Sequence, residues 1–180
     1  MSIGFKEWTL ICDALGSGAQ SIILRKGGIA EGRDGFRFQH GEFFLFPTLF
    51  HEQVSKLKLP PETQLPQNVA EGEISIHYRA RVEWTRDLTD LSMVERLAPF
   101  HLWRDEVIRE RFEYDGNQGV SLAFVRVEKL SAPFTFPSAA RYGGCRSWVT
   151  LPEPPSEVFT SPVLNESAHR AAEEKIKGIL

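Results

Sequence analysis

The clearest pattern along the chain is the alternation of apolar and polar side chains over residues 74–84. A period of two residues is typical of a β-strand with one buried side and one solvent-facing side. The solvent-facing side of this strand carries His77, Arg79, Arg81 and Glu83. Residues 120–130 also alternate, between apolar positions and charged ones, and predict another strand.

The first half of the chain predicts a helix, two strands and a short second helix. Apolar side chains within residues 5–15 share one face at helical spacing, which predicts an amphipathic helix of about three turns. A strand is predicted over residues 21–24 and a second over 36–46, interrupted where glycine follows His40. Thr48 is predicted to cap a short helix that runs to Lys56.

Three helices are predicted in the second half of the chain. Ser92 and Glu95 have the spacing of a capping box at the start of a short helix. Residues 104–112 and 165–177 also have helical spacing, and Asn165 is placed to cap the last helix. Residues 60–72 contain three prolines without apolar periodicity, which predicts a surface loop.

Short strands interposed with helices predict an α+β fold. Long helices do not alternate regularly with strands, so we expect a small, mixed, partly closed β-barrel-like sheet rather than a doubly wound one. We predict one globular domain over residues 1–151. Prolines at positions 152, 154 and 155 then begin a linker to the C-terminal helix, so residues 152–180 form an appendage.

Net charge and cysteine content limit which kinds of partner and cellular compartment we expect. The net charge is −3, of which residues 151–180 carry −2, so the body of the chain is almost neutral. A protein that grips nucleic-acid backbones without specificity usually has a basic excess. The two cysteines give no disulfide framework, and no signal peptide or membrane span is visible. We therefore expect a cytoplasmic protein that does not bind a membrane.

The predicted binding site is a set of cationic side chains. Arg79 and Arg81 share the polar side of one strand, and an anion site follows if Arg25, Lys26 and Arg37 lie on neighbouring strand ends. Planar guanidinium groups suit phosphates and base edges. The alternative is an ordinary solvated strand face with cross-strand pairs to Glu73 or Glu83.

Evidence for catalysis is sparse. His40, Glu42, His51 and Glu52 offer metal-ligand atoms, but their spacing matches no known ligand pattern. Cys145 is the better nucleophile, because glycines precede it and Arg146 follows it, yet the sequence assigns it no base. Trp148, next in this segment, is a possible platform for stacking on a base, although a core position is the alternative. We predict no cofactor and no metal.

Four short segments carry a family resemblance: Lys6-Glu7-Trp8, Leu24-Arg25-Lys26-Gly27-Gly28-Ile29, residues 45–51 (LFPTLFH) and Gly143-Gly144-Cys145-Arg146-Ser147-Trp148. Through them residues 4–151 resemble the bacterial domain-of-unknown-function family numbered 1802. That resemblance implies no activity and no catalytic residues. The order of elements, with a glycine turn before a strand that ends in Arg25, is similar to small barrels of the PUA, ASCH and EVE kind. That similarity implies a cleft that binds RNA or a modified base.

Three functions remain open at this point. The first is a non-catalytic module that binds nucleic acid or a nucleotide, with RNA or modified DNA as partner and with Arg25, Lys26, Arg37, Arg79, Arg81, Arg146 and Trp148 as the binding residues. The second is a hydrolase that uses Cys145 or a metal site. The third is a structural protein that forms a homo-oligomer through the helix at 165–177.

Overall fold

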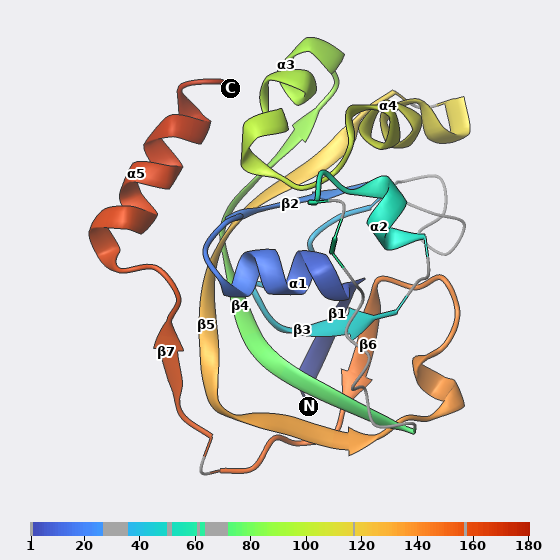
Figure 1. The fold of residues 1–180 in the computed structure, drawn as a ribbon, viewed down its shortest axis with the longest axis vertical. Helices are drawn as coiled ribbons and strands as arrows, with labels where there is room; N and C mark the ends of the chain where they lie inside the picture. The colour runs from blue at the N-terminus through green and yellow to red at the C-terminus, as the bar shows by residue number, and fades with distance from the viewer. Residues whose placement is uncertain are drawn as a thin grey trace.

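The protein has an α+β fold built on one mixed seven-stranded sheet (Figure 1). A computed structural model describes residues 2–26, 36–49, 52–60, 62–63, 72–116, 118–156 and 158–180. The strands are β1 (Ser2–Trp8), β2 (Ile22–Arg25), β3 (Glu42–Thr48), β4 (Glu73–Leu88), β5 (Val120–Pro137), β6 (Trp148–Leu151) and β7 (Thr160–Pro162). The α-helices are α1 (Thr9–Gly16), α2 (Gln53–Lys56), α3 (Leu91–Arg96), α4 (Asp105–Glu113) and α5 (Glu166–Lys177). Within the residues described, single-turn 3₁₀ helices span Ala98–Phe100, Tyr114–Gly116 and Ala140–Tyr142.

The sheet is strongly curved but not closed. Its strand order is β2-β5-β4-β3-β1-β6, and β7 pairs with β5 outside this path. Within the described residues β2 and β6 are not paired, so the sheet keeps two free ends. The β4–β5 ladder shifts register between Ile76 and Tyr78 and again between Val82 and Trp84, and such irregularities allow long strands to bend. The prediction of a mixed, partly closed sheet is confirmed.

The helix predicted over residues 5–15 is wrong in its first half. Residues up to Trp8 belong to β1, which pairs in parallel with β3 and antiparallel with β6. Phe5 and Glu7 are buried while Lys6 and Trp8 are half-buried, so the strand period of two applies from Phe5 onward. Strand pairing on both sides outweighs the helical spacing of the apolar residues.

The strand predicted over residues 36–46 begins later and ends later. Residues 36–40 have no regular secondary structure, and β3 starts at Glu42 and continues through Pro47 to Thr48. Proline is tolerated at position 47 because β4 pairs only with residues 42–44 of β3. Pro47 therefore has a neighbouring strand on one side only, β1. Thr48 therefore ends a strand and does not cap α2, whose N-cap is Glu52.

The other predicted elements correspond to observed ones, with changed ends. β4 contains the alternating strand, and β5 contains the strand predicted over 120–130 but runs on to Pro137. The cap of α3 is Asp90, whose side chain accepts a hydrogen bond from the Ser92 backbone, so the predicted capping box is wrong. The cap of α5 is Asn165, as predicted, through a hydrogen bond of 2.9 Å from the Ala168 backbone. Most of the predicted loop at 60–72 lies outside the described residues.

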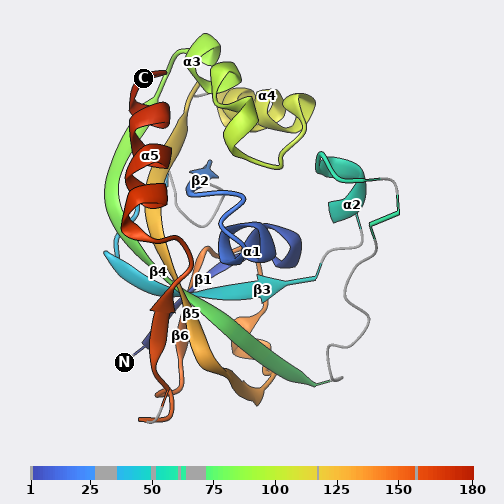
Figure 2. The same ribbon diagram turned by 60° about the vertical axis from the view of Figure 1, so that its left-hand side comes forward.

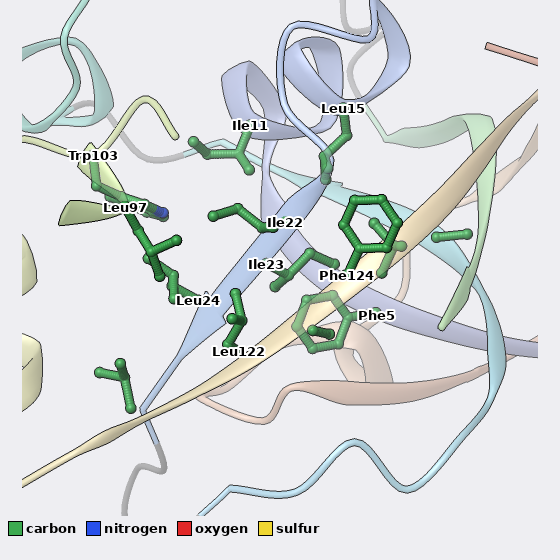
Figure 3. Close-up of a cluster of buried hydrophobic side chains, with 14 of the residues drawn as sticks. Phe5, Ile11, Leu15, Ile22, Ile23, Leu24, Leu97, Trp103, Leu122 and Phe124 are labelled. Atoms are coloured by element: carbon green, nitrogen blue, oxygen red, sulfur yellow. The ribbon is translucent and has the colours of Figure 1, made fainter. Parts of the chain in front are cut away.

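The main core lies between the concave sheet and α1, α3 and α4. Figure 3 shows Ile11 and Leu15 on α1 facing Ile22 and Ile23 on β2, with Trp103 and Leu97 beside them. A second cluster of buried aromatic residues fills the other end of the β4–β5 ladder, around Phe46, Phe134, Phe136 and Tyr142. Aromatic side chains therefore contribute to the core at both ends of the sheet.

Helix α5 packs on the sheet beside β4 and β5 (Figures 1 and 2). His169 and Ile176 are its buried residues, and the His169 ring lies 4.8 Å from that of Phe124. Self-association through this helix stays a prediction. No helix among the described residues is long and apolar enough to cross a membrane.

Candidate anion-binding site

A pocket of about 420 Å³ opens where the ends of β1 and β2 meet α4 and the turn at 143–147. We call it the basic pocket, and its lining residues are Trp8, Arg25, Lys26, Lys56, Val107, Glu110, Arg111, Tyr114, Cys145 and Ser147. The cationic side chains of Arg25, Lys26, Lys56 and Arg111 face one lining carboxylate, that of Glu110. In Figure 1, α2 and α4 lie at the upper right, and β2 runs toward them.

Arg25 is held in place by contacts on three sides. It is the last residue of β2, opposite Ser121 of β5. Its guanidinium donates two hydrogen bonds to Ser147 Oγ, from Nε at 3.4 Å and from Nη2 at 3.3 Å. Nη1 lies 3.7 Å from Glu7 Oε2, and the group stands over the Phe5 ring at 5.1 Å. A guanidinium fixed in this way loses little conformational freedom when it binds an anion.

Glu7 is the buried counter-charge of the basic pocket, with only 1% of its side chain exposed. Its Oε1 accepts a hydrogen bond of 2.8 Å from the Trp8 backbone. Its Oε2 has no hydrogen-bond partner within the described part of the chain and faces Arg25 as an ion pair. A buried carboxylate requires a nearby cation, so Glu7 and Arg25 stabilise each other.

Arg111 forms the second fixed guanidinium. It projects from α4 and stacks over the Trp103 ring at 3.5 Å, with the Trp8 ring at 5.8 Å. The pKa of Arg111 is lowered to about 10, mainly by burial; Glu7 opposes this shift and nearby Arg25 adds to it. Arg111 therefore remains charged at neutral pH. Stacked arginine is a common receptor for phosphate and carboxylate groups.

The two lysines add charge that is less tightly fixed. Lys26 follows β2 directly, and its Nζ lies 3.5 Å from the Phe112 carbonyl oxygen, to which it donates. Lys56 ends α2 and pairs with Glu52 at 3.4 Å, one helical turn earlier. Together with the two arginines, they leave the lining of the pocket with an excess of positive charge.

The segments that carry the family resemblance meet around this pocket. The Lys6 backbone donates to the Ser147 carbonyl oxygen at 2.8 Å, and Lys6 Nζ donates to the carbonyl oxygens of Tyr142 and Gly144 at 2.8 and 2.7 Å. Thr48 Oγ1 donates to the Glu7 carbonyl oxygen at 3.0 Å. Gly144 has a φ of 77°, which favours glycine in this turn. Residues 27–29 and 50–51 of these segments lie outside the described residues.

Arg79 and Arg81 lie elsewhere, on the outer side of the sheet. Arg79 pairs with Glu128 at 2.9 Å and with Glu42 at 3.8 Å, and Arg81 pairs with Glu83 at 2.9 Å. Arg25 is opposite position 121 of β5 and Arg79 is opposite position 128, which separates them by roughly 23 Å along the strand. The structure thus brings Arg25 and Lys26 together and places Arg79 and Arg81 in carboxylate pairs.

Trp148 belongs to an aromatic cluster. Its ring is stacked with Phe36 at 6.1 Å and contacts Phe5 and His40, both at 4.9 Å. Arg37, next to Phe36, and Arg146, two residues before Trp148, are both exposed. Neither arginine lines the basic pocket. Of the seven predicted binding residues, Arg25 and Lys26 share the pocket.

The residues considered for catalysis are separated from one another. Cys145 is exposed and lines the basic pocket, whereas Cys12 is buried, and burial raises the pKa of its thiol well above the ordinary value. His40 packs on Trp148, Glu52 pairs with Lys56, and His51 is outside the described residues. No three His, Cys, Asp or Glu side chains gather as metal ligands within the described ranges.

Glu7, Arg111 and Lys56 are not among the binding residues that the sequence predicts. Glu7 was assigned to an amphipathic helix, where a carboxylate is unremarkable. In the observed strand, Phe5 and Glu7 both lie on the buried side. A carboxylate on the buried side of a strand is unusual, and it would have pointed to a paired charge in a site. Arg111 gave no signal, because an arginine on a surface helix is common.

Comparisons with solved structures find ASCH proteins from Zymomonas mobilis. The crystal structure of a serine-to-alanine mutant has a TM-score of 0.48 and 12% identity, and covers 97% of this chain and 95% of that one. The crystal structure titled ASCH from the same organism has a TM-score of 0.45 and 13% identity, with 96% and 94% of the two chains covered. No curated protein matches the chain in sequence.

The family resemblance found in the sequence is confirmed. A family model described as "Domain of unknown function (DUF1802)" matches residues 4–175, and so extends past residue 151 into α5. The match spans the strands and turns that form the basic pocket. The chain belongs to the DUF1802 family.

Proposed function

We propose that the protein binds nucleic acid or a nucleotide, without catalysis, by holding a phosphate group in the basic pocket. The observation that supports this most is the cluster of Arg25, Lys26, Lys56 and Arg111 around a cavity of about 420 Å³. A cavity of this size accommodates a phosphate and part of a sugar rather than a duplex. RNA and modified DNA are the partners we propose.

The arrangement of the two guanidinium groups supports phosphate as the ligand. Arg25 is fixed by Glu7 and Ser147, and Arg111 is fixed by stacking on Trp103, so both groups are oriented before a ligand arrives. Two oriented guanidinium groups can hold one phosphate through several charge-assisted hydrogen bonds. Trp8 and the half-exposed Tyr114 at the wall offer rings for stacking.

The charge distribution supports local binding of a single strand or a nucleotide. The chain as a whole has a net charge of −3, so long-range attraction does not draw it to a polyanion. Binding therefore depends on the few cations of the pocket, and few phosphates are contacted at once. We expect a shallow salt dependence, with a slope of log K against log salt of roughly −1 to −3.

The experiment is a fluorescence-anisotropy titration of a labelled single-stranded RNA 8-mer at several salt concentrations. Lys26→Glu should weaken binding at least tenfold and make the salt slope shallower by about one, because one cation is removed. Arg111→Gln is the second variant, and its folding is checked by circular dichroism. Arg79→Ala and Arg81→Ala are matched controls, and they should change affinity less than twofold.

Two results would contradict the proposal. Binding that is lost in Arg79→Ala but retained in Lys26→Glu would move the site to the outer side of the sheet. Failure to bind RNA, DNA, nucleoside monophosphates and inorganic phosphate would leave the pocket without its proposed ligand.

A hydrolase that uses the Cys145 thiol is the second candidate function, since this thiol lines the same pocket beside Ser147. Iodoacetamide should then label Cys145 rapidly and stoichiometrically while the buried Cys12 remains unmodified. Slow labelling of both cysteines would count against this function.

A further inference from the structure

A second and larger cavity, of about 740 Å³, lies on the other side of the turn at 143–147. It is bounded by α1, the end of β3, the start of β4 and the segment that precedes the turn. Phe46, Tyr78 and Tyr142 contribute aromatic side chains, and Asp13 and His77 contribute polar ones. The cavity is less charged than the basic pocket and large enough for a planar heterocycle.

The two cavities are adjacent, because neighbouring residues of β1 and of the turn line one or the other. Lys6 lines the second cavity and Trp8 lines the basic pocket, and these residues are two positions apart on β1, about 7 Å along the strand. The turn is shared in the same way, because Gly143 lines the second cavity and Cys145 lines the basic pocket. Lys6 Nζ ties the turn to β1 through its hydrogen bonds to the carbonyl oxygens of Tyr142 and Gly144.

The polar groups of the second cavity are suited to reading the edge of a base. Asp13 lies on α1 and lines the cavity, and within the described residues neither of its side-chain oxygens accepts a hydrogen bond. Its backbone oxygen accepts a hydrogen bond from the Ser17 backbone. Burial raises the pKa of Asp13 and nearby His77 opposes that shift. Burial likewise raises the pKa of Tyr78, which keeps its hydroxyl as a donor. A carboxylate in such a cavity accepts well from an amino group, as acidic side chains do from cytosine N4.

We propose that the second cavity holds the base of a nucleotide whose phosphate lies in the basic pocket, and that Asp13 selects bases that carry an exocyclic amino group. This inference rests on the proposed function, since it takes the phosphate position from it. It adds a second binding site and a preference among bases. Uracil, which has a carbonyl oxygen where cytosine has an amino group, is disfavoured by Asp13.

The test is isothermal titration calorimetry on the full chain with ribose 5-phosphate, cytidine 5′-monophosphate and uridine 5′-monophosphate. The cytidine nucleotide should bind about tenfold more tightly than ribose 5-phosphate, because stacking and hydrogen bonding of a base typically contribute that much. It should also bind at least fivefold more tightly than the uridine nucleotide. Asp13→Ala should remove the difference between cytidine and uridine and leave ribose 5-phosphate unaffected.

A filled-cavity variant provides an independent readout. Ala140 is exposed and lines the second cavity, so Ala140→Trp should lower the affinity for cytidine monophosphate to that for ribose 5-phosphate. Ala171→Trp, at an exposed position of α5, is the matched control and should bind like the unmodified protein. If the cytidine nucleotide and ribose 5-phosphate bind equally, or if Ala140→Trp changes nothing, the inference is overturned and the proposed function stands. If ribose 5-phosphate and inorganic phosphate both fail to bind, the proposed function itself is wrong.

Discussion

Two regions of this protein are rich in arginine, and they differ in what surrounds each guanidinium group. In the basic pocket Arg25 and Arg111 share one buried carboxylate, that of Glu7. On the outer side of β4 and β5, Arg79 pairs with Glu128 and Glu42, and Arg126 pairs with Glu83 at 3.1 Å and with Glu166 at 2.9 Å. The outer network is electrically balanced, whereas the basic pocket has cations in excess.

This difference shows why the number of arginines on a strand does not identify a binding site. The outer network uses its charges for cross-strand pairs and for attaching α5, and exposed pairs of this kind contribute little free energy each. The basic pocket keeps its charges in a concave, partly desolvated place, where attraction for an anion is stronger.

Removal of one carboxylate should destabilise the pocket side far more than the outer side. Glu7→Gln leaves the partly buried Arg25 and Arg111 without their buried counter-charge, and we expect a loss of about 3 kcal/mol in the free energy of unfolding. Glu83→Gln removes a carboxylate that is 27% exposed, and we expect a loss below about 1 kcal/mol. Urea denaturation at pH 7.5 measures both.

Added anion distinguishes the cause of the Glu7→Gln effect. Inorganic phosphate at 50 mM should restore part of the lost stability of Glu7→Gln, because the ligand supplies the missing negative charge. It should stabilise Glu83→Gln only as much as it stabilises the unmodified protein, because the pocket of that variant is unchanged. Equal losses in the two variants, or an absence of rescue by phosphate, would mean that the charge excess in the pocket does not control its stability.

Two buried histidines, His101 and His169, differ in the charges around them, so they should contribute differently to the pH dependence of stability. Burial, together with the nearby cations Lys58 and Arg111, lowers the pKa of His101 from 6.5 to about 3. Burial and Arg126 also lower the pKa of His169, but there Glu83, Glu166 and Glu173 oppose the shift. A lowered pKa in the folded state means that the unfolded chain binds the proton first, so stability is lost as the pH falls below about 6.5.

We therefore expect His101 to account for about 2 kcal/mol of the stability lost between pH 7.5 and pH 5. His101→Phe should reduce that loss by this amount, since the two ring nitrogens have no hydrogen-bond partner in the part of the chain that the structure describes. His169→Phe, the matched variant, should reduce it less. Urea denaturation at both pH values gives the comparison, and a larger effect of His169→Phe would reverse our assignment of the two environments.

The same contrast explains how far the sequence could predict the structure. The strand at 74–84 was predictable because period-two alternation of side chains is a local property. The Arg79–Glu128 pair joins β4 to β5 and is a cross-strand pair, as expected for an ordinary solvated strand face. The strand at the N-terminus was not, because β1 exists through its pairing with β3 and β6, more than 30 residues away. Glu7 therefore could not be recognised as a buried charge, and Arg111 could not be assigned to the same pocket as Arg25.

The smallest expected difference concerns two tryptophans, one on each side of the comparison. Trp84 Nε1 donates to Glu173 Oε1 at 2.8 Å and so joins β4 to α5, while Trp148 Nε1, beside the pocket turn, is buried without a partner in the described residues. Both rings are half-buried and each packs on phenylalanine, Trp84 on Phe124 at 5.4 Å and Trp148 on Phe36 at 6.1 Å. Substitution by phenylalanine removes the same atoms from both sites, so the difference between the variants isolates the hydrogen bond.

Trp84→Phe should lower the free energy of unfolding by about 1 kcal/mol more than Trp148→Phe, because only the first variant loses a formed hydrogen bond while the second loses an unpaired donor. If urea denaturation gives equal values for the two variants, the bond to Glu173 does not hold α5 to the sheet, and the outer network is weaker than its geometry indicates.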